Sequence, residues 1–365
     1  MRTRGALLTA VGGPLEIVDL ELDPPGPGEL LVRIGATGLC HSDLSVLDGS
    51  RVRPLPMVLG HEAAGEVLEV GPGAEFAVGD HVVLSFVPAC GGCRRCASGR
   101  PALCEPGGAA NRAGTLLSGA RRMRLPDGTR PHHHLGVSGF AEHAVVSGRS
   151  ATRVPADLPF EVAALFGCAV LTGAGAVLHS AGVGPGEKVA VFGLGGVGLA
   201  ALLAARAAGA TTVIAVDVVA HKRELALRLG ATHALDGGPD VVGQVRELTG
   251  GGADKVIDTT GVADVLERAY RATDVGGTTV AVGLSPPDRV VTLPALGLVA
   301  EERTLKGSYL GSGVPRRDVP RFVDLYRAGV LPVHELLSGR LSLDGLDAGF
   351  ARLASGEAVR QVVVR

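Results

Sequence analysis

The chain has 365 residues, 46% of them hydrophobic, and a formal net charge of −2. This length allows two domains with substantial cores, and the charge suggests neither nucleic acid nor an anionic membrane as a partner. No apolar run reaches the roughly 18 residues of a membrane span. The N-terminus lacks the regions of a signal peptide, so we expect a cytoplasmic protein that binds neither nucleic acid nor membrane.

The first part of the chain consists of short predicted strands separated by turns rich in proline and glycine. Alternating apolar residues predict strands over 15–20, 29–34, 65–70 and 81–85. A further strand over 140–146 is expected to return to the same sheet. Many short strands with frequent turns predict a compact β-barrel.

Two cysteines and a histidine form a candidate catalytic metal site. Cys40 and His61 each follow an apolar segment, and Cys168 lies in a helix that we expect over residues 161–180. Two thiolates and an imidazole are a ligand set of catalytic zinc, which keeps its fourth position for water or substrate. We therefore expect Cys40, His61 and Cys168 to surround one zinc ion.

Four further cysteines lie close together within residues 88–106. Cys90, Cys93, Cys96 and Cys104 have a spacing that can close a tetrahedral zinc site of the structural type. An iron–sulfur cluster is the competing metal, but the ferredoxin continuation is missing. Disulfides are the other alternative, and without a secretion signal metal binding is the better interpretation.

A histidine triplet, His132–His134, lies between this cysteine cluster and the strand expected at 140–146. It could suggest a further metal site. Adjacent side chains diverge, however, and seldom share one ion. We interpret the triplet as part of a solvated or pocket-lining loop.

A glycine-rich loop follows the apolar strand 188–192 and opens an alanine- and leucine-rich helix that ends near Ala208. The G-x-G-x-x-G pattern in this context, with an acidic residue 24 positions after its first glycine (217 − 193), is typical of dinucleotide binding. The acid would accept hydrogen bonds from ribose hydroxyls and repel a 2′-phosphate, which favours NAD over NADP. The alternative is a glycine-rich turn with an ordinary surface aspartate. The candidate residues are Gly193, Leu194, Gly195, Gly196, Val197, Gly198 and Asp217.

Strands and helices then alternate, which predicts a doubly wound parallel sheet. The expected strands are 212–216, a segment near Ala234, 255–258 and 278–282, and the expected helices are 222–229, 241–249 and 263–272. The remaining chain predicts helices over 316–328 and 344–355 and a last strand over 361–364.

Several motifs together resemble those of the zinc-dependent medium-chain alcohol dehydrogenases, within the medium-chain dehydrogenase/reductase superfamily. They are GLCHSD at 38–43, GHEAAGE at 60–66, the four-cysteine lobe, GC at 167–168, GLGGVG at 193–198 and GEAVRQVVV at 356–364. The resemblance covers essentially the whole chain. It implies an α/β protein with a GroES-like β-barrel catalytic domain (1–169 and 310–365), a Rossmann-like NAD-binding domain (170–309), and an active site in the cleft between them.

The resemblance also implies roles for individual residues. Cys40, His61 and Cys168 match the catalytic zinc ligands, and Glu62 matches a carboxylate that can approach the metal. Asp43 matches the acid that orients the ligand imidazole, and Ser42 the hydroxyl that takes the alcohol proton. The other matches are His41 and Arg360 (pyrophosphate), Lys222 (adenosine ribose), Val282, Gly283 and Leu284 (backbone beside the nicotinamide), and Phe86, His134 and Tyr309 (substrate pocket).

Three positions depart from the family pattern. Ser45 stands where liver-type members carry a histidine that passes the proton to solvent, so the relay would end in water or use His41. Gly108 stands where the formaldehyde-oxidising class has a glutathione-binding arginine, although Arg112 is close. His134 occupies a pocket position that is usually apolar or aromatic.

We therefore expect an NAD-dependent zinc alcohol dehydrogenase that interconverts an alcohol, by resemblance a primary one, and its aldehyde or ketone. Two zinc ions per subunit, one catalytic and one structural, and a homodimer complete the expectation. One alternative is a formaldehyde dehydrogenase that acts on a thiol adduct. The alternative from another class is a non-catalytic NAD-binding protein with structural zinc only.

Overall fold

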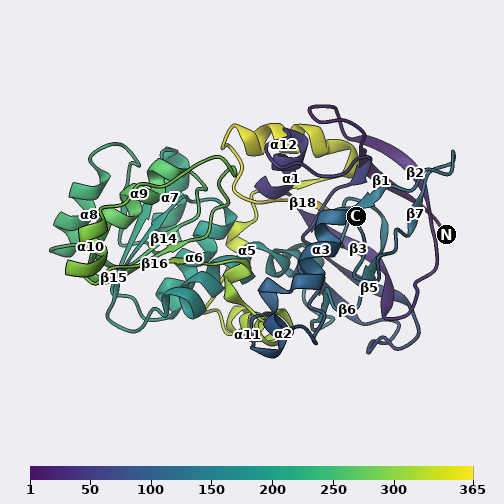
Figure 1. The fold of residues 1–365 in the computed structure, drawn as a ribbon, viewed down its shortest axis with the longest axis horizontal. Helices are drawn as coiled ribbons and strands as arrows, with labels where there is room; N and C mark the ends of the chain where they lie inside the picture. Colours follow the sequence, from purple (N-terminus) through teal and green to yellow (C-terminus); the bar gives the residue numbers. More distant parts are fainter. Residues whose placement is uncertain (365) are drawn as a thin grey trace. The chain divides into compact units, whose positions relative to one another are not determined.

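The computed structural model describes residues 1–364, and within them the chain forms two compact units. Unit 1 comprises 1–168, 314–324 and 337–365, and unit 2 comprises 169–313 and 325–336. Figure 1 shows the chain coloured from purple to yellow, with unit 2 largely in teal and green. Each unit has its own sheets and its own buried core.

Unit 1 is built from two sheets that share a core. The first has the order β7-β2-β1-β4-β8, and the second β10-β6-β5-β3-β18-β17, with β9 also paired to β3. Apolar side chains from both sheets, including Leu20, Val58, Leu31 and Val145, pack in one cluster. The bounds are β1 Arg2–Leu8, β2 Glu16–Leu22, β3 Glu29–Gly38, β4 Met57–Val58, β5 Ala63–Val70, β6 His81–Leu84, β7 Met123–Arg124, β8 His132–His133, β9 His143–Ser147, β10 Ala151–Arg153, β17 Gly339–Leu341 and β18 Gln361–Val364.

The C-terminal strand β18 joins the second of these sheets beside a strand from the N-terminal part of the chain. β18 pairs antiparallel with β3, with Val362 opposite Gly38, and the purple and yellow ribbons lie side by side there in Figure 1. The helices outside the parallel sheet are α1 His41–Leu47, α2 Arg94–Ala97, α3 Glu105–Ala113, α4 Phe160–Ala163, α5 Ala169–Gly175, α11 Pro315–Arg327 and α12 Leu346–Ala354. Short 3₁₀ turns occupy Pro101–Leu103, Ala164–Gly167, Leu310–Ser312, Val333–Leu336 and Leu343–Gly345, and a π-helix Ala176–Ala181.

Unit 2 contains a six-stranded sheet in which every pairing is parallel, in the order β13-β12-β11-β14-β15-β16. Side chains of α8 and α9 pack on β11, β12 and β14 in an apolar cluster. The predicted doubly wound sheet is thus confirmed. The strands are β11 Lys188–Phe192, β12 Thr212–Val216, β13 His233–Leu235, β14 Ala253–Asp258, β15 Thr273–Ala281 and β16 Thr304–Gly307, and the helices α6 Gly196–Ala207, α7 Ala220–Arg228, α8 Val241–Thr249, α9 Ala263–Ala272 and α10 Ala295–Ala300.

The prediction of one helix over 161–180 that carries Cys168 is wrong. The helix is interrupted at Cys168, whose φ of −140° and ψ of −68° are not helical. Packing explains the break, because Gly167 lies so close to β6 that a Cβ there would be 2.3 Å from the Leu84 carbonyl oxygen. Tertiary contact therefore overrides the local preference for a continuous helix.

No single helix within residues 1–364 is long and apolar enough to cross a membrane. The two helical segments 160–167 and 169–181, which are bent at Cys168, reach the required length and hydrophobicity only when they are counted together.

Candidate functional site

Four side chains from separate parts of unit 1 converge at one buried point. Cys40 follows β3, His61 and Glu62 lie between β4 and β5, and Cys168 lies at the helix break. Their ligand atoms all lie within 4.8 Å of one another, and all four residues are buried. The structure therefore brings together the three residues that the sequence analysis placed around one metal ion and the Glu62 carboxylate that it expected beside them.

Two glycines make this convergence possible. Gly60 has a φ of +92°, which only glycine adopts without strain, and its position leaves no room for a Cβ beside the Phe140 amide. A Cβ on Gly38 would lie 1.9 Å from Oε1 of Glu62. The backbone at Gly60 thus turns His61 inward, and the bare backbone at Gly38 accommodates the carboxylate.

Asp43, fully buried in α1, holds the imidazole of His61. Its Oδ2 lies 3.0 Å from Nδ1 of His61, and its Oδ1 lies 3.0 Å from Nδ1 of His134 and accepts the Gly60 amide at 3.1 Å. Although burial alone would raise it, the two imidazoles hold the pKa of Asp43 below its usual value. A proton on Nδ1 of His61 then leaves Nε2 as the free lone pair.

A cation fits among these groups. Nε2 of His61 is buried and has no hydrogen-bond partner within residues 1–364, and such a buried polar atom is costly unless it is bound. A hydrogen bond from the Cys168 thiol lowers the pKa of Cys40 well below its usual value, and the same contact, together with burial, raises the pKa of Cys168. Two adjacent sulfurs of which only one ionises readily become two thiolates when a divalent metal binds, and two sulfurs with one imidazole suit zinc.

Arg360 balances the carboxylate at this point. Its Nη1 lies 2.7 Å from Oε1 of Glu62 and donates to the Leu39 carbonyl at 2.9 Å. Burial raises the pKa of Glu62 to about 7, and Arg360 opposes that rise. The predicted pyrophosphate contact of Arg360 is therefore a role that it would combine with an ion pair inside unit 1.

The four cysteines of the lobe also converge. The sulfurs of Cys90, Cys93, Cys96 and Cys104 lie within 4.8 Å of one another. Backbone amides point at them: those of Cys90 and Gly107 donate to Sγ of Cys104 at 3.2 and 3.4 Å. All six cysteines are free thiols. A closed tetrathiolate set with amide donors fits a structural zinc ion.

The pocket residues predicted from the resemblance lie in different units. The rings of Phe86 and His134 both stand edge-on to the ring of His61, each with a centroid distance of 5.6 Å. Tyr309 belongs to unit 2 and is 37% exposed. His41 and Ser42 lie in the first turn of α1, exposed and half-buried respectively.

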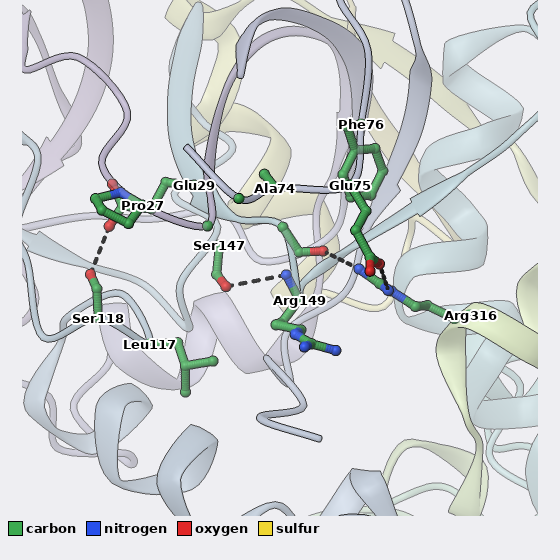
Figure 2. A pocket seen from close by; sticks show the side chains of 13 residues that line it. Pro27, Glu29, Ala74, Glu75, Phe76, Leu117, Ser118, Ser147, Arg149 and Arg316 are labelled. Atoms are coloured by element: carbon green, nitrogen blue, oxygen red, sulfur yellow. Dashed lines mark hydrogen bonds and ion pairs between the residues drawn. The ribbon is translucent and has the colours of Figure 1, made fainter. Parts of the chain in front are cut away.

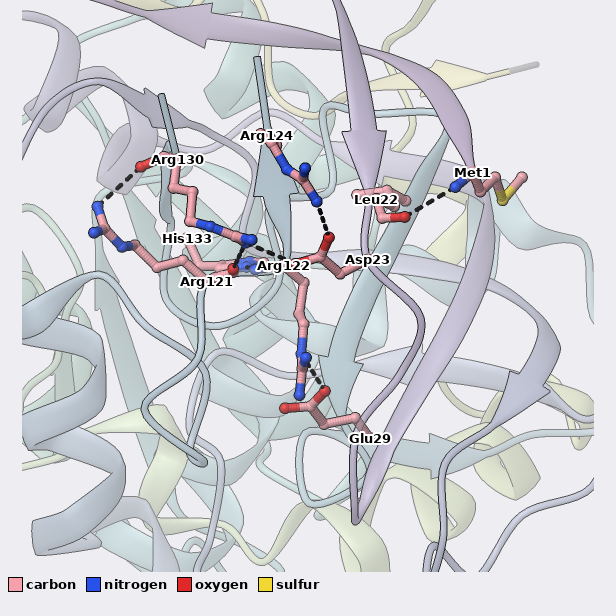
Figure 3. Close-up of polar contacts among 9 residues, drawn as sticks. All are labelled: Met1, Leu22, Asp23, Glu29, Arg121, Arg122, Arg124, Arg130 and His133. Carbon is pink, nitrogen blue, oxygen red and sulfur yellow. Dashed lines mark hydrogen bonds and ion pairs between the residues drawn. The ribbon is translucent and has the colours of Figure 1, made fainter. Parts of the chain in front are cut away.

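The interpretation of the histidine triplet as a solvated or pocket-lining loop is wrong for His133, whereas a pocket-lining position of His134 stays a prediction; the side chains do diverge. His133 is fully buried in β8, where its Nε2 accepts the Arg122 amide at 3.1 Å (Figure 3). His134 turns to Asp43 instead. Burial, reinforced by the charges of Arg122 and other neighbours, lowers the pKa of His133 to about 3.

The buried His133 should make the protein sensitive to acid. The unfolded chain takes up this proton near pH 6.5 and the folded chain only near pH 3, so stability should fall as the pH falls between these values. At pH 5 the loss should be roughly 2 kcal/mol. Denaturant unfolding followed by circular dichroism at pH 5 and 8 measures it. His133→Gln keeps a hydrogen-bond acceptor and takes up no proton. Between pH 8 and pH 5 its free energy of unfolding should therefore fall by roughly 2 kcal/mol less than that of the original protein.

The matched control for this measurement is His132→Gln, the same replacement at a half-buried neighbour. It should retain the pH dependence of the original protein. Equal pH dependence in the original protein and His133→Gln would contradict the assignment.

A surface pocket of about 310 Å³ in unit 1 lies apart from these groups (Figure 2). It is lined by Glu29, Phe76, Arg149 and Arg316 among others, and by none of the predicted site residues. Its buried carboxylate is already satisfied, since Glu29 accepts from Ser118 at 2.6 Å and from Arg122 at 2.8 Å. We assign this pocket no role in the chemistry.

The glycine loop of unit 2 has the geometry that a dinucleotide needs. Gly193 has a φ of +87°, and a Cβ on Gly198 would lie 1.8 Å from the Gly193 carbonyl oxygen. A Cβ on Gly195 would meet nothing within 4 Å, so the backbone is open there. Asp217, at the end of β12, accepts the amides of Leu194 at 2.7 Å and Val219 at 2.9 Å.

Other predicted cofactor residues lie near the same edge of the sheet. Val282, Gly283 and Leu284 follow β15, and Lys222 is buried in α7. The sequence analysis missed Thr259, whose Oγ1 donates to the carbonyls of Phe192 and Gly193 at 3.1 and 2.9 Å. A hydroxyl directly after β14, the strand beside β11, was the available signal. The carboxyl ends of the strands around the order reversal are where doubly wound sheets bind ligands.

Comparison with known proteins supports the same interpretation. Residues 26–156 match the alcohol dehydrogenase GroES-like domain and residues 196–328 the zinc-binding dehydrogenase family. The chain is 41% identical to the NDMA-dependent alcohol dehydrogenase of Amycolatopsis methanolica, covering 100% of this chain and 99% of that protein. It is 41% identical to the geraniol dehydrogenase of Castellaniella defragrans, covering 99% and 97%. The chain belongs to the zinc-dependent medium-chain dehydrogenase family.

As a member of the medium-chain dehydrogenase family, the protein is an oxidoreductase with a GroES-like domain and a Rossmann-like domain. A solved structure of an alcohol dehydrogenase zinc-binding domain protein from Burkholderia ambifaria superposes with a TM-score of 0.96 at 38% identity, covering 100% of this chain and 99% of that one. The predicted fold class and the recognition of the family are therefore confirmed. The family supports zinc and a nicotinamide cofactor as the groups that the two candidate sites would hold.

Proposed function

We propose that this dehydrogenase interconverts a primary alcohol and its aldehyde, with NAD as the hydride acceptor and zinc held by Cys40, His61 and Cys168. The observation that carries the proposal is a buried set of two sulfurs and one imidazole, whose Nε2 has no hydrogen-bond partner in the described part of the chain, with ligand atoms within 4.8 Å of one another. The relatives' names support the substrate class, since geraniol is a primary alcohol.

Each residue around this site would have a separate role in the reaction. Bound zinc would supply the positive charge that lowers the pKa of the substrate hydroxyl. Asp43 fixes the tautomer and orientation of His61 through Nδ1. Ser42 Oγ, in the first turn of α1, would take the hydroxyl proton and pass it to water or to the neighbouring His41. Phe86 packs against His61 and excludes water from that side.

A second zinc ion would be held by Cys90, Cys93, Cys96 and Cys104, which gives two ions per subunit. These two sites would differ in function. The lobe has four sulfurs and no open position, so its ion would stabilise the fold. Unit 1 would then be the catalytic domain and unit 2 the cofactor-binding domain.

Asp217 should decide between NAD and NADP. Its carboxylate follows β12 and is held by the Leu194 and Val219 amides. Like charges placed together cost several kcal/mol, so Asp217→Ser should shift the kcat/KM ratio toward NADP by at least about 100-fold. Glu224→Ser, which removes an exposed acid from α7, is the matched control and should leave the ratio unchanged. An unchanged ratio in Asp217→Ser would assign the discrimination to other residues.

We also propose that the enzyme is a cytoplasmic homodimer. Six free thiols suit a reducing compartment. The surface of unit 2 supports self-association, because α10 has no buried residue and Leu296 and Val299 are 77% and 79% exposed. The neighbouring strand β16 is at the edge of the sheet and exposed along its length. An exposed apolar patch beside an unpaired strand edge is typical of an interface.

The proposal is tested by metal analysis and a substrate panel on the purified protein. Two zinc ions per subunit and formation of NADH with primary alcohols, including geraniol, are expected. Parallel reactions contain NADP, NDMA as an added acceptor, or a thiol with formaldehyde, so that a cofactor that stays bound or a thiol adduct is recognised. Lack of any alcohol-dependent reaction in all of these would overturn the proposal, and activity only with the thiol adduct would replace it with the formaldehyde dehydrogenase.

A further inference from the structure

Asp43 is shared between two imidazoles, and only one of them belongs to the cysteine cluster. His61 contacts its Oδ2 and His134 its Oδ1, each at 3.0 Å, and the Gly60 amide reaches Oδ1 as well. Asp43 is 0% exposed and both histidines are 1% exposed. A carboxylate in such a place needs several donors to remain ionised. His134 is therefore one of the three groups that fix the charge and the position of the Asp43 side chain.

The loop that carries His134 is held in an uncommon conformation. Leu135 and Ser138 have positive φ values of 52° and 53°, which cost free energy in residues other than glycine. Ser138 is anchored, since its Oγ accepts the His134 amide at 3.0 Å and donates to the Val58 carbonyl at 2.9 Å. Backbone strain that the surrounding structure maintains suggests that the placement of His134 has a function.

The direction of the imidazole distinguishes two roles for His134. A residue that only lined the substrate pocket could be any apolar ring, as at the corresponding position of the family pattern. Here Nδ1 lies 3.0 Å from Oδ1 of Asp43, and the ring stands edge-on to His61 at an interplanar angle of 85°. His134 thus contacts both the carboxylate and the imidazole that this carboxylate orients.

We infer that His134 is a positioning residue that clamps Asp43 against His61 and so holds the proposed zinc ligand in its binding orientation. This inference rests on the proposed function. Groups that orient a metal-bound histidine typically change metal affinity by 10- to 100-fold when they are removed. The clamp would act through Asp43, and it requires a donor at the position of Nδ1.

Three substitutions of His134 test whether a hydrogen-bond donor is needed at the position of Nδ1 or whether any polar side chain is sufficient. The amide of asparagine places its NH₂ near the position of Nδ1, whereas that of glutamine reaches the position of Nε2. His134→Asn should therefore keep the contact to Asp43, and His134→Gln and His134→Phe should lose it. The readout is the rate at which zinc passes to a chromogenic chelator, with the tetrathiolate lobe as an internal control in every variant.

We expect the zinc ion of the Cys40 site to leave at least about 10-fold faster in His134→Phe and His134→Gln than in the original protein. His134→Asn should release it at close to the original rate, and the lobe zinc should leave equally slowly in all four proteins. Equal release rates in His134→Gln and the original protein would overturn the inference. If His134→Phe does not fold, the comparison of asparagine with glutamine remains decisive.

The zinc content of the unmodified protein distinguishes a failure of the proposed function from a failure of the inference about His134. If the unmodified protein held zinc only in its lobe, the proposed function would fail before any variant was compared. If it held two ions and all variants released them alike, only the clamp would be wrong. Cobalt substitution gives a second readout, because a displaced imidazole changes the visible absorption of the ion in the variants that lose the clamp.

Discussion

Cys40→Ser is expected to lose one zinc ion per subunit and nearly all dehydrogenase activity. Serine cannot supply the thiolate that Cys40 offers beside Cys168 and His61, and its hydroxyl is a far weaker ligand for zinc. A Lewis acid contributes several kcal/mol to this type of reaction. The rate should therefore fall by at least about 1,000-fold, and elemental analysis should find one zinc ion where the original protein has two.

The same variant decides between an enzyme and a binding protein. NAD binding, measured by calorimetry, should be largely retained, because the glycine loop and Asp217 belong to unit 2 and Cys40 to unit 1, and the variant leaves His41 and Arg360 unchanged. The lobe zinc that remains shows that the protein is folded. Full activity in Cys40→Ser, or two retained zinc ions, would contradict the assignment of the ligands.

Local chemistry made much of the fold predictable from sequence. The bounds of α8 agree with the prediction because Gly250, with a φ of +74°, ends the helix directly after Thr249. Strand β11 has the predicted bounds because five residues with a continuous apolar run lie between a turn and a glycine loop. In both cases the signal lies within a few residues of the element that it determines.

The missed features depend on partners that are distant in the sequence. The break at Cys168 comes from the approach of Gly167 to Leu84 in β6, and nothing near residue 168 indicates it. His134 lies 91 residues from Asp43 (134 − 43), so their contact at 3.0 Å could not be inferred from spacing. His133 is buried in β8, and its Nε2 accepts the amide of Arg122, which lies 11 residues earlier and directly precedes β7; no local pattern indicates this contact.

The metal ligands are an intermediate case. Residue types and motifs identified Cys40, His61 and Cys168 as a group, whereas the structure was needed to bring their ligand atoms within 4.8 Å. It also showed how Glu62 enters the group, through the space that Gly38 leaves open and the ion pair with Arg360. Residue types and motifs can therefore identify the members of a site from sequence, whereas the structure is needed to show what each member contacts.

Cys96→Ser is expected to open the lobe without removing the zinc ion of the Cys40 site. None of the residues in the short helix α2 is buried, so a zinc ion bound by the four sulfurs would supply much of the free energy that holds this segment. Loss of that ion should raise the rate of tryptic cleavage after Arg94 and Arg95 by at least about 100-fold, because local opening would cost several kcal/mol less.

Limited proteolysis with mass spectrometry, in the presence of a phosphine reductant, measures this cleavage. Cys168→Ser is the matched control, since it removes a thiol from the other cluster and should leave α2 protected. Chelation of the lobe zinc from the original protein should reproduce the cleavage pattern of Cys96→Ser. Resistance of Cys96→Ser to trypsin, with two zinc ions still bound, would show that the lobe is held by its backbone contacts and does not depend on a fourth sulfur.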